Sequence, residues 1–240
     1  MPNRFSGRED PRRAFLLKAL AAGLLSGVPA AIPGALAQVL GRRPQRLPAG
    51  QSIYEVTGPV LVNGQPATSA TRITATDRVE TGKGARLIFV VGADAFILRE
   101  NSKLEMRGNN LVVNLFRLTT GALLSVFGRG ASKQLHTPTA EIGIRGTGLY
   151  VESQPDQSYV CTCYGEVNIA AANDPSISER IITKHHDAPR YVLGPGAARR
   201  IVPAGFINHS DVELMLIESL VGRTTPFSLF DQEYGAPRRY

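Results

Sequence analysis

The stretch from Glu141 to Glu152 (EIGIRGTGLYVE) constrains the fold of this chain more than any other part. Before Gly146 and after Gly148, apolar residues alternate with polar or small ones, which is the period-two pattern of a half-buried strand. Glycine permits a positive φ or a close backbone approach, as at a bulge or a sheet corner. The sequence therefore predicts two strand segments that meet at a kink around Thr147.

The kink has two interpretations. It can be a structural corner of an all-β core, in which its residues only shape the sheet. Alternatively, Arg145 and Thr147 project from the corner and bind a partner.

The sequence before this stretch predicts many short strands. Turn signals recur at roughly every 8–12 residues, which is typical of an all-β sandwich or a coil of short strands. Asn63-Gly64 is a two-residue hairpin signal, and residues 86–91 (RLIFVV) form an apolar run expected to be buried on both faces. The expected fold class is mainly β, as a sandwich or a β-helix-like stack of short antiparallel strands.

The C-terminal part is expected to combine a β extension with one helix. Residues 171–205 form the extension, and residues 170–176, where it begins, are interpreted as a loop. Ser210 and Glu213 match a capping box, and the apolar stripe that follows ends near Gly222. Residues 206–240 are therefore interpreted as a C-terminal α-helix, packed on the sheet, and a tail.

Residues 1–37 have the features of an export signal. Arg12-Arg13 precede an apolar stretch, and a small-x-small cleavage motif ends at Ala37. A twin-arginine signal is favoured over a general secretory signal. Because Lys18 and two prolines interrupt the apolar run, an uncleaved anchor is disfavoured, and no stable transmembrane segment is expected after cleavage. The expected location is the periplasm.

Residues 38–51 are rich in proline and arginine and are interpreted as a linker. The formal net charge of the chain is +7, but residues 1–37 hold five of its 27 Lys and Arg and two of its 20 acidic residues. The rest therefore carries about +4, without a basic stripe interleaved with aromatics. This argues against a nucleic-acid partner.

Cys161 and Cys163 are the candidates for chemistry. Residues i and i+2 of a strand face the same way, with Cα atoms about 6.5–7 Å apart, at the limit for a disulfide. About twenty residues later, His185-His186 provide nitrogen donors typical of copper, zinc or iron sites. A transition metal or haem site of the Cys2His or Cys2His2 kind is one hypothesis; buried structural cysteines beside exposed loop histidines, or a reactive thiol pair, are the others.

Common catalytic motifs are missing from the sequence. There is no Gly-x-Ser-x-Gly elbow, no phosphate-binding glycine loop and no His-Glu-x-x-His. His209 directly precedes the predicted helix cap and is not among the predicted metal ligands. The chain is not expected to be an enzyme.

Four motifs together resemble the FecR-type domain, the periplasmic module of iron-citrate-type signalling regulators. They are residues 137–151, which resemble its signature, and residues 56–64, 77–82 and 165–169, which resemble its opening hairpin, central turn and closing strand. The resemblance covers residues 52–170. It implies periplasmic sensing through protein–protein contacts.

Typical members of that family carry an anti-sigma segment and a transmembrane helix before this domain, and this chain shows neither. We therefore expect a periplasmic binding, signalling or scaffold module that contacts an envelope protein and needs no cofactor. The alternative is a periplasmic metal- or haem-binding protein that uses Cys161, Cys163, His185 and His186. This alternative requires the four side chains to converge within a few ångströms.

Overall fold

A computed structural model describes residues 45–109, 111–128, 130 and 132–227. The predicted export signal, with Arg12 and Arg13, lies outside the described residues. In the described part of the chain, no helix has both the length and the apolar character needed to cross a bilayer.

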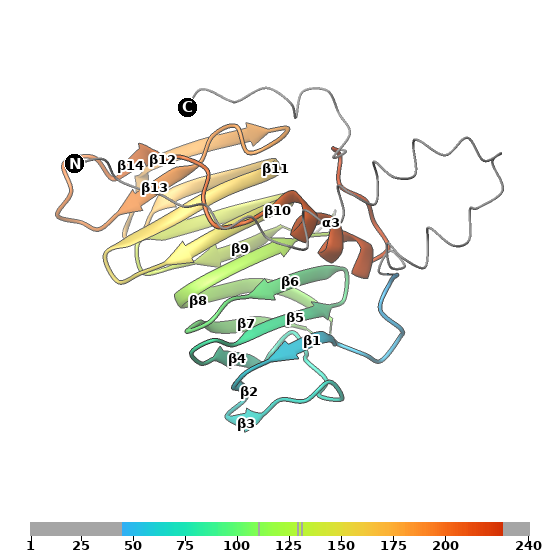
Figure 1. Cartoon of the computed structure of the whole chain (residues 1–240). Helices are drawn as coiled ribbons and strands as arrows, with labels where there is room; N and C mark the ends of the chain where they lie inside the picture. Colours follow the sequence, from blue (N-terminus) through green and yellow to red (C-terminus); the bar gives the residue numbers. More distant parts are fainter. Residues whose placement is uncertain (1–44, 110, 129, 131, 228–240) are drawn as a thin grey trace, which may run out of the picture. The chain divides into compact units, whose positions relative to one another are not determined.

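The described residues form a large β-sheet and one C-terminal helix (Figure 1). The strands are β1 (Ile53–Thr57), β2 (Val60–Val62), β3 (Gln65–Pro66), β4 (Arg78–Thr81), β5 (Arg86–Val91), β6 (Asp94–Leu98), β7 (Lys103–Asn109), β8 (Val112–Val126), β9 (Lys133–His136), β10 (Ala140–Ser153), β11 (Gln157–Ala171), β12 (Asp174–Thr183), β13 (Arg190–Leu193) and β14 (Ile201–Pro203). The helix is α3 (Asp211–Leu220). The predicted fold class, mainly β with a C-terminal helix, is confirmed.

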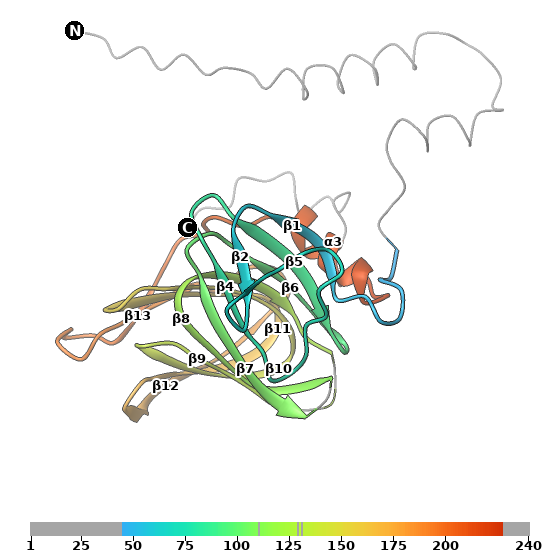
Figure 2. The ribbon, with the colours of Figure 1, turned by 90° about the horizontal axis from the view of Figure 1, so that it is seen from below.

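The strands belong to one mixed sheet. Its main order is β14-β13-β11-β10-β9-β8-β7-β4-β2-β3, and β6, β5 and β1 branch from β8. Neighbours are antiparallel except β8 and β9, which run parallel. The sheet curves around its own core (Figure 2).

Three strands are longer than the turn signals predicted. β8, β10 and β11 have 15, 14 and 15 residues. Each contains one glycine with positive φ: Gly121 at 89°, Gly146 at 54° and Gly165 at 93°. These glycines bend the strands without ending them, because glycine adopts this conformation without steric cost.

The predicted kink is confirmed as an irregularity between β10 and β11. Their pairing shifts register between Arg145 and Gly148 and again before Leu149. A side chain at Gly148 would place its Cβ 2.4 Å from the ring of Tyr164, so this position requires glycine.

The prediction of a loop at residues 170–176 is wrong. β11 continues to Ala171 and β12 starts at Asp174, so only a tight turn separates them. Asn173 makes this turn with a φ of 64°, a conformation that asparagine tolerates better than most residues.

Two apolar clusters fill the structure. The larger lies inside the curved sheet and includes Phe89, Phe96 and Phe116. The smaller lies under α3, where Leu214 and Ile217 pack against the sheet as predicted. The capping box at the start of α3 is present: the Ser210 hydroxyl accepts from the Glu213 amide, and the Glu213 carboxylate accepts from the Ser210 amide.

A buried ion pair links β6 and β9. Lys133 Nζ lies 2.8 Å from Asp94 Oδ2, and both side chains are at most 6% exposed. Lys133 also donates to the Val113 carbonyl, and the Gly128 amide donates to Asp94 Oδ1. These additional hydrogen bonds are the condition under which two charges are tolerated in a core.

We expect Asp94→Asn to lower the free energy of unfolding by about 3–5 kcal/mol, since it leaves the Lys133 charge buried without its partner. Denaturant unfolding measures this change. The control is Lys103→Gln, which removes an ion pair to Glu80 from a lysine that is 51% exposed and should cost less than about 1 kcal/mol. Equal losses in the two variants would contradict the role assigned to Asp94.

Candidate metal centre

Two cysteines of β11 contribute the sulfur atoms of the candidate site. Cys161 and Cys163 are both fully buried free thiols, and both belong to the apolar cluster under α3. Cys161 pairs with Tyr150 of β10, whereas Cys163 lies at the register shift, between Thr162, which pairs with Leu149, and Tyr164, which pairs with Gly148. The kink therefore sits beside the second thiol.

The turn after β12 brings a histidine onto these cysteines. Asp187 Oδ2 accepts hydrogen bonds from the Thr183 hydroxyl and from the amides of Lys184 and His185, which fixes the turn. His186 has a φ of 50°, which is uncommon for a residue other than glycine. Its amide donates to the Cys163 carbonyl, and its ring is 4% exposed.

The segment before α3 supplies a second histidine. His209 directly precedes the helix cap Ser210, and its ring stacks on Tyr150 with centroids 4.4 Å apart. Its Nε2 points to Cys163 Sγ at 3.4 Å. The sequence analysis did not assign His209 to the site, because nothing in the local pattern shows that the loop before α3 folds back onto β11.

Four donor atoms thus gather around one point. Sγ of Cys161 and Cys163, Nδ1 of His186 and Nε2 of His209 all lie within 4.8 Å of one another. Cys161 Sγ to His186 Nδ1 is 3.3 Å, and His186 Nδ1 to His209 Nε2 is 3.2 Å. Tetrahedral zinc with ordinary bond lengths would place two nitrogens about 3.3 Å apart and a sulfur and a nitrogen about 3.6 Å apart. The measured separations match these edges to within a few tenths of an ångström.

The outward-facing nitrogens of both imidazoles have partners. Nδ1 of His209 lies 2.6 Å from the Ile207 carbonyl oxygen, and Nε2 of His186 lies 3.0 Å from Asp211 Oδ1. A carbonyl or carboxylate in this position fixes the tautomer that directs the other nitrogen, with its lone pair, toward a metal. Both rings are therefore oriented as ligands.

The predicted ligand His185 takes a different place. Its Nε2 lies 3.0 Å from Asp211 Oδ1, in a second group formed by His185, His186 and Asp211. The structure thus brings together three of the four predicted ligands and places His209 where His185 was expected. Neighbouring residues in a tight turn point to different sides, so only one of the two adjacent histidines reaches the cysteines.

The charges of the group are mutually dependent. A hydrogen bond from Cys163 lowers the pKa of Cys161; burial opposes this shift, and a hydrogen bond with His186 adds to it. Burial raises the pKa of Cys163. Burial alone would lower the pKa of His186, but hydrogen bonds to Asp211 and Cys161 outweigh it and raise the pKa. Burial would raise the pKa of Asp211, and the two histidines lower it overall. Cys161 is therefore the thiol that ionises first.

The donor set fits a single ion better than haem. Haem iron takes axial ligands on opposite faces of a wide ring. Here four donors surround one small volume, and the rings of Phe206 and Phe227 lie against the histidines. Two thiolates and two imidazoles are a common structural zinc set.

The other predicted binding residues lie at the kink. Thr147 is fully buried, and its hydroxyl donates to the carbonyl of Tyr164. It does not project toward a partner. Arg145 is exposed on the surface of β10.

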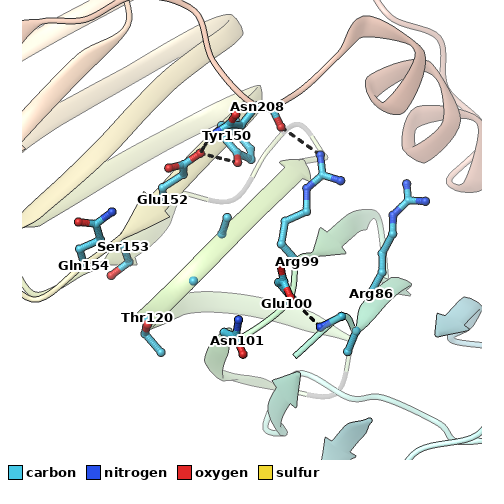
Figure 3. Close-up of a pocket in the computed structure, with 14 residues that line it drawn as sticks. Arg86, Arg99, Glu100, Asn101, Thr120, Tyr150, Glu152, Ser153, Gln154 and Asn208 are labelled. Atoms are coloured by element: carbon cyan, nitrogen blue, oxygen red, sulfur yellow. Dashed lines mark hydrogen bonds between the residues drawn. The ribbon is translucent and has the colours of Figure 1, made fainter. Parts of the chain in front are cut away.

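A polar hollow of about 590 Å³ lies beside the start of α3 (Figure 3). Arg99 reaches across it to Glu213 and to the carbonyl of Asn208, and Tyr150 donates to Glu152. Arg99 is thus paired with Glu213, and Glu152 accepts hydrogen bonds from the neutral side chains of Tyr150 and Asn208. Tyr150 belongs both to this wall and to the support of His209.

This chain shows little similarity to known proteins. No protein-family model matches the sequence, and no curated protein matches it. Two crystal structures of a protein named as a "putative anti-sigma factor" from Parabacteroides distasonis align with it, at 11% identity and TM-scores of 0.43 and 0.44. The alignments cover 53% of this chain and 59% of those chains. The resemblance to the FecR-type domain stays a prediction.

We expect Thr147→Val to lower the free energy of unfolding by about 1–3 kcal/mol, because it removes the donor to a buried carbonyl. Arg145→Ala is the control at the same kink and should stay within about 0.5 kcal/mol, as exposed substitutions do. Thermal or denaturant unfolding measures both. A larger loss for the arginine variant would contradict the corner interpretation.

Proposed function

We propose that this protein is a metal-binding β module that holds one divalent transition ion, zinc by its donor set, between Cys161, Cys163, His186 and His209. The observation that carries the proposal is that the four donors gather within 4.8 Å of one another and that three of their separations match the edges of a tetrahedral site. The two imidazoles oriented by Asp211 and the Ile207 carbonyl support it.

The role of this ion is structural and not catalytic. Four protein ligands complete a tetrahedral shell, whereas catalytic zinc keeps one position for water or substrate. The ligands come from β11, the turn after β12 and the segment before α3. The ion therefore fastens the helical segment to the sheet, in a protein that we propose is not an enzyme.

We further propose that the module works in the periplasm, after export by the twin-arginine route. That route carries folded proteins, which suits a chain that binds its ion before it crosses the membrane. The Arg12-Arg13 motif supports this location. Bound metal would also protect the two thiols from oxidation in that compartment.

A protein-binding role, as expected of a FecR-type signalling or scaffold module, is the second candidate. The observation in its favour is β12, which among the described strands pairs only with β11. Ile182 on β12 is 66% exposed. An unpaired strand edge with an exposed apolar side chain suits the addition of a strand from an envelope protein.

We expect the protein, purified after export from its own signal without added chelator, to contain close to one zinc per chain by elemental analysis. Cys161→Ser/Cys163→Ser and His209→Ala should each lose it. His136→Ala is the matched control, because His136 lies on β9 outside the cluster, and it should keep the ion. Metal-free wild-type protein that also fails to bind added zinc would overturn the proposal and leave the protein-binding role.

Removal of the ion should destabilise the fold. Zinc at a hundred times its dissociation constant adds about 2.7 kcal/mol to the free energy of unfolding when only the folded state binds it. We therefore expect the melting temperature to fall on chelation and to recover with zinc. The His209→Ala variant should melt at the same temperature with and without chelator.

A further inference from the structure

We propose that His185, His186 and Asp211 form a second, outer cation site, joined to the inner centre by the imidazole of His186. This inference rests on the proposed inner site and extends it. The ligand class is a divalent first-row transition ion bound by two imidazole nitrogens and one carboxylate oxygen.

The three donor atoms have the spacing of a site. Nε2 of His185 and Nε2 of His186 each lie 3.0 Å from Asp211 Oδ1, and all three atoms lie within 4.8 Å of one another. Two ligands at right angles on a metal with bonds of about 2.1 Å would be about 3.0 Å apart. An octahedral or square-based ion therefore fits with little movement.

The ring of His186 faces both groups. Its Nδ1 belongs to the inner cluster, 3.3 Å from Cys161 Sγ, and its Nε2 faces Asp211. An imidazole bound through both nitrogens would hold two ions about 6 Å apart. When the outer ion binds, the proton on Nε2 of His186 passes to solvent and His186 becomes a bridging imidazolate, whereas His185 binds as a neutral imidazole with its proton on Nδ1.

The two sites differ in their access to solvent. The inner cysteines are fully buried, and His209 is 7% exposed. The side chains of His185 and Asp211 are 16% and 12% exposed. The outer site thus lies toward solvent, and its three protein ligands leave coordination positions for water or for a donor from another molecule.

The elements that hold the outer donors are also fixed. His185 lies in the turn that Asp187 closes. Asp211 is the first residue of α3, where the positive end of the helix dipole favours a carboxylate. The outer site would therefore respond to the same docking of α3 that completes the inner one.

A simpler arrangement uses the same distances. Asp211 can accept one hydrogen bond from each histidine and only orient His186 for the inner ion. That arrangement predicts one ion per chain, and the outer site predicts two.

The test is a cobalt titration of the reduced, metal-free full chain, with Co²⁺ as the probe. The first equivalent should produce thiolate-to-cobalt charge-transfer absorption from the inner site. The second equivalent should add visible cobalt absorption without further charge transfer, because the outer donors are nitrogen and oxygen. Equilibrium dialysis gives the number of ions bound.

Two variants assign the second equivalent. His185→Gln should keep the charge-transfer band and weaken the second binding event by at least about tenfold, whereas Asp211→Asn should weaken both binding events because Asp211 also orients His186. Asp174→Asn, at the first residue of β12, and His136→Ala are matched controls and should bind two ions. Melting curves show whether each variant is folded.

The outcomes separate the two proposals. The outer site is overturned, and the inner centre retained, if the wild-type protein binds one ion with charge-transfer absorption and Asp211→Asn binds that ion more weakly. Two ions in both ligand variants, with unchanged affinity, would also overturn it. No charge transfer in wild type would overturn the inner centre itself.

Discussion

The structure depends on the close contact of two strands at one bend. Gly146 of β10 and Gly165 of β11 both have positive φ, and they face each other. A Cβ on Gly165 would lie 2.9 Å from the Gly146 carbonyl oxygen and 2.8 Å from the Thr147 Cβ. The hydroxyl of Thr147 closes the contact by donating to Tyr164. The paired strands can change direction here only because neither glycine carries a side chain.

β11 supplies side chains to both apolar clusters, and Val160, in the larger one, lies before this bend. Cys161 and Cys163 precede it and lie in the cluster under α3. Val167 and Ile169 follow it and lie inside the curved sheet. One strand thereby supplies both the sheet core and the thiols. The histidines reach these thiols only because the turn after β12 and the segment before α3 fold back onto the same face.

The features that were predictable from the sequence are local ones. Alternation and glycines located the kink, Ser210 and Glu213 located the helix cap, and strand geometry put both cysteines on one face. The continuity of β8, β10 and β11 through their bends was not predictable, because a glycine at a bend and a glycine at a turn look the same without the pairing of neighbouring strands. His209 was missed for a related reason: its contact with Cys163 spans 46 residues, and no local period carries such information.

The order of the ligands along the chain has a consequence for biogenesis. Cys161 and Cys163 emerge from the ribosome first and His209 last, and α3 follows directly. The proposed tetrahedral coordination therefore cannot be completed while synthesis is still within the β region. Until then the thiols are open to the wrong metal. The proposed ion can be held by all four ligands only after the C-terminal segment has been synthesised and has packed on the sheet.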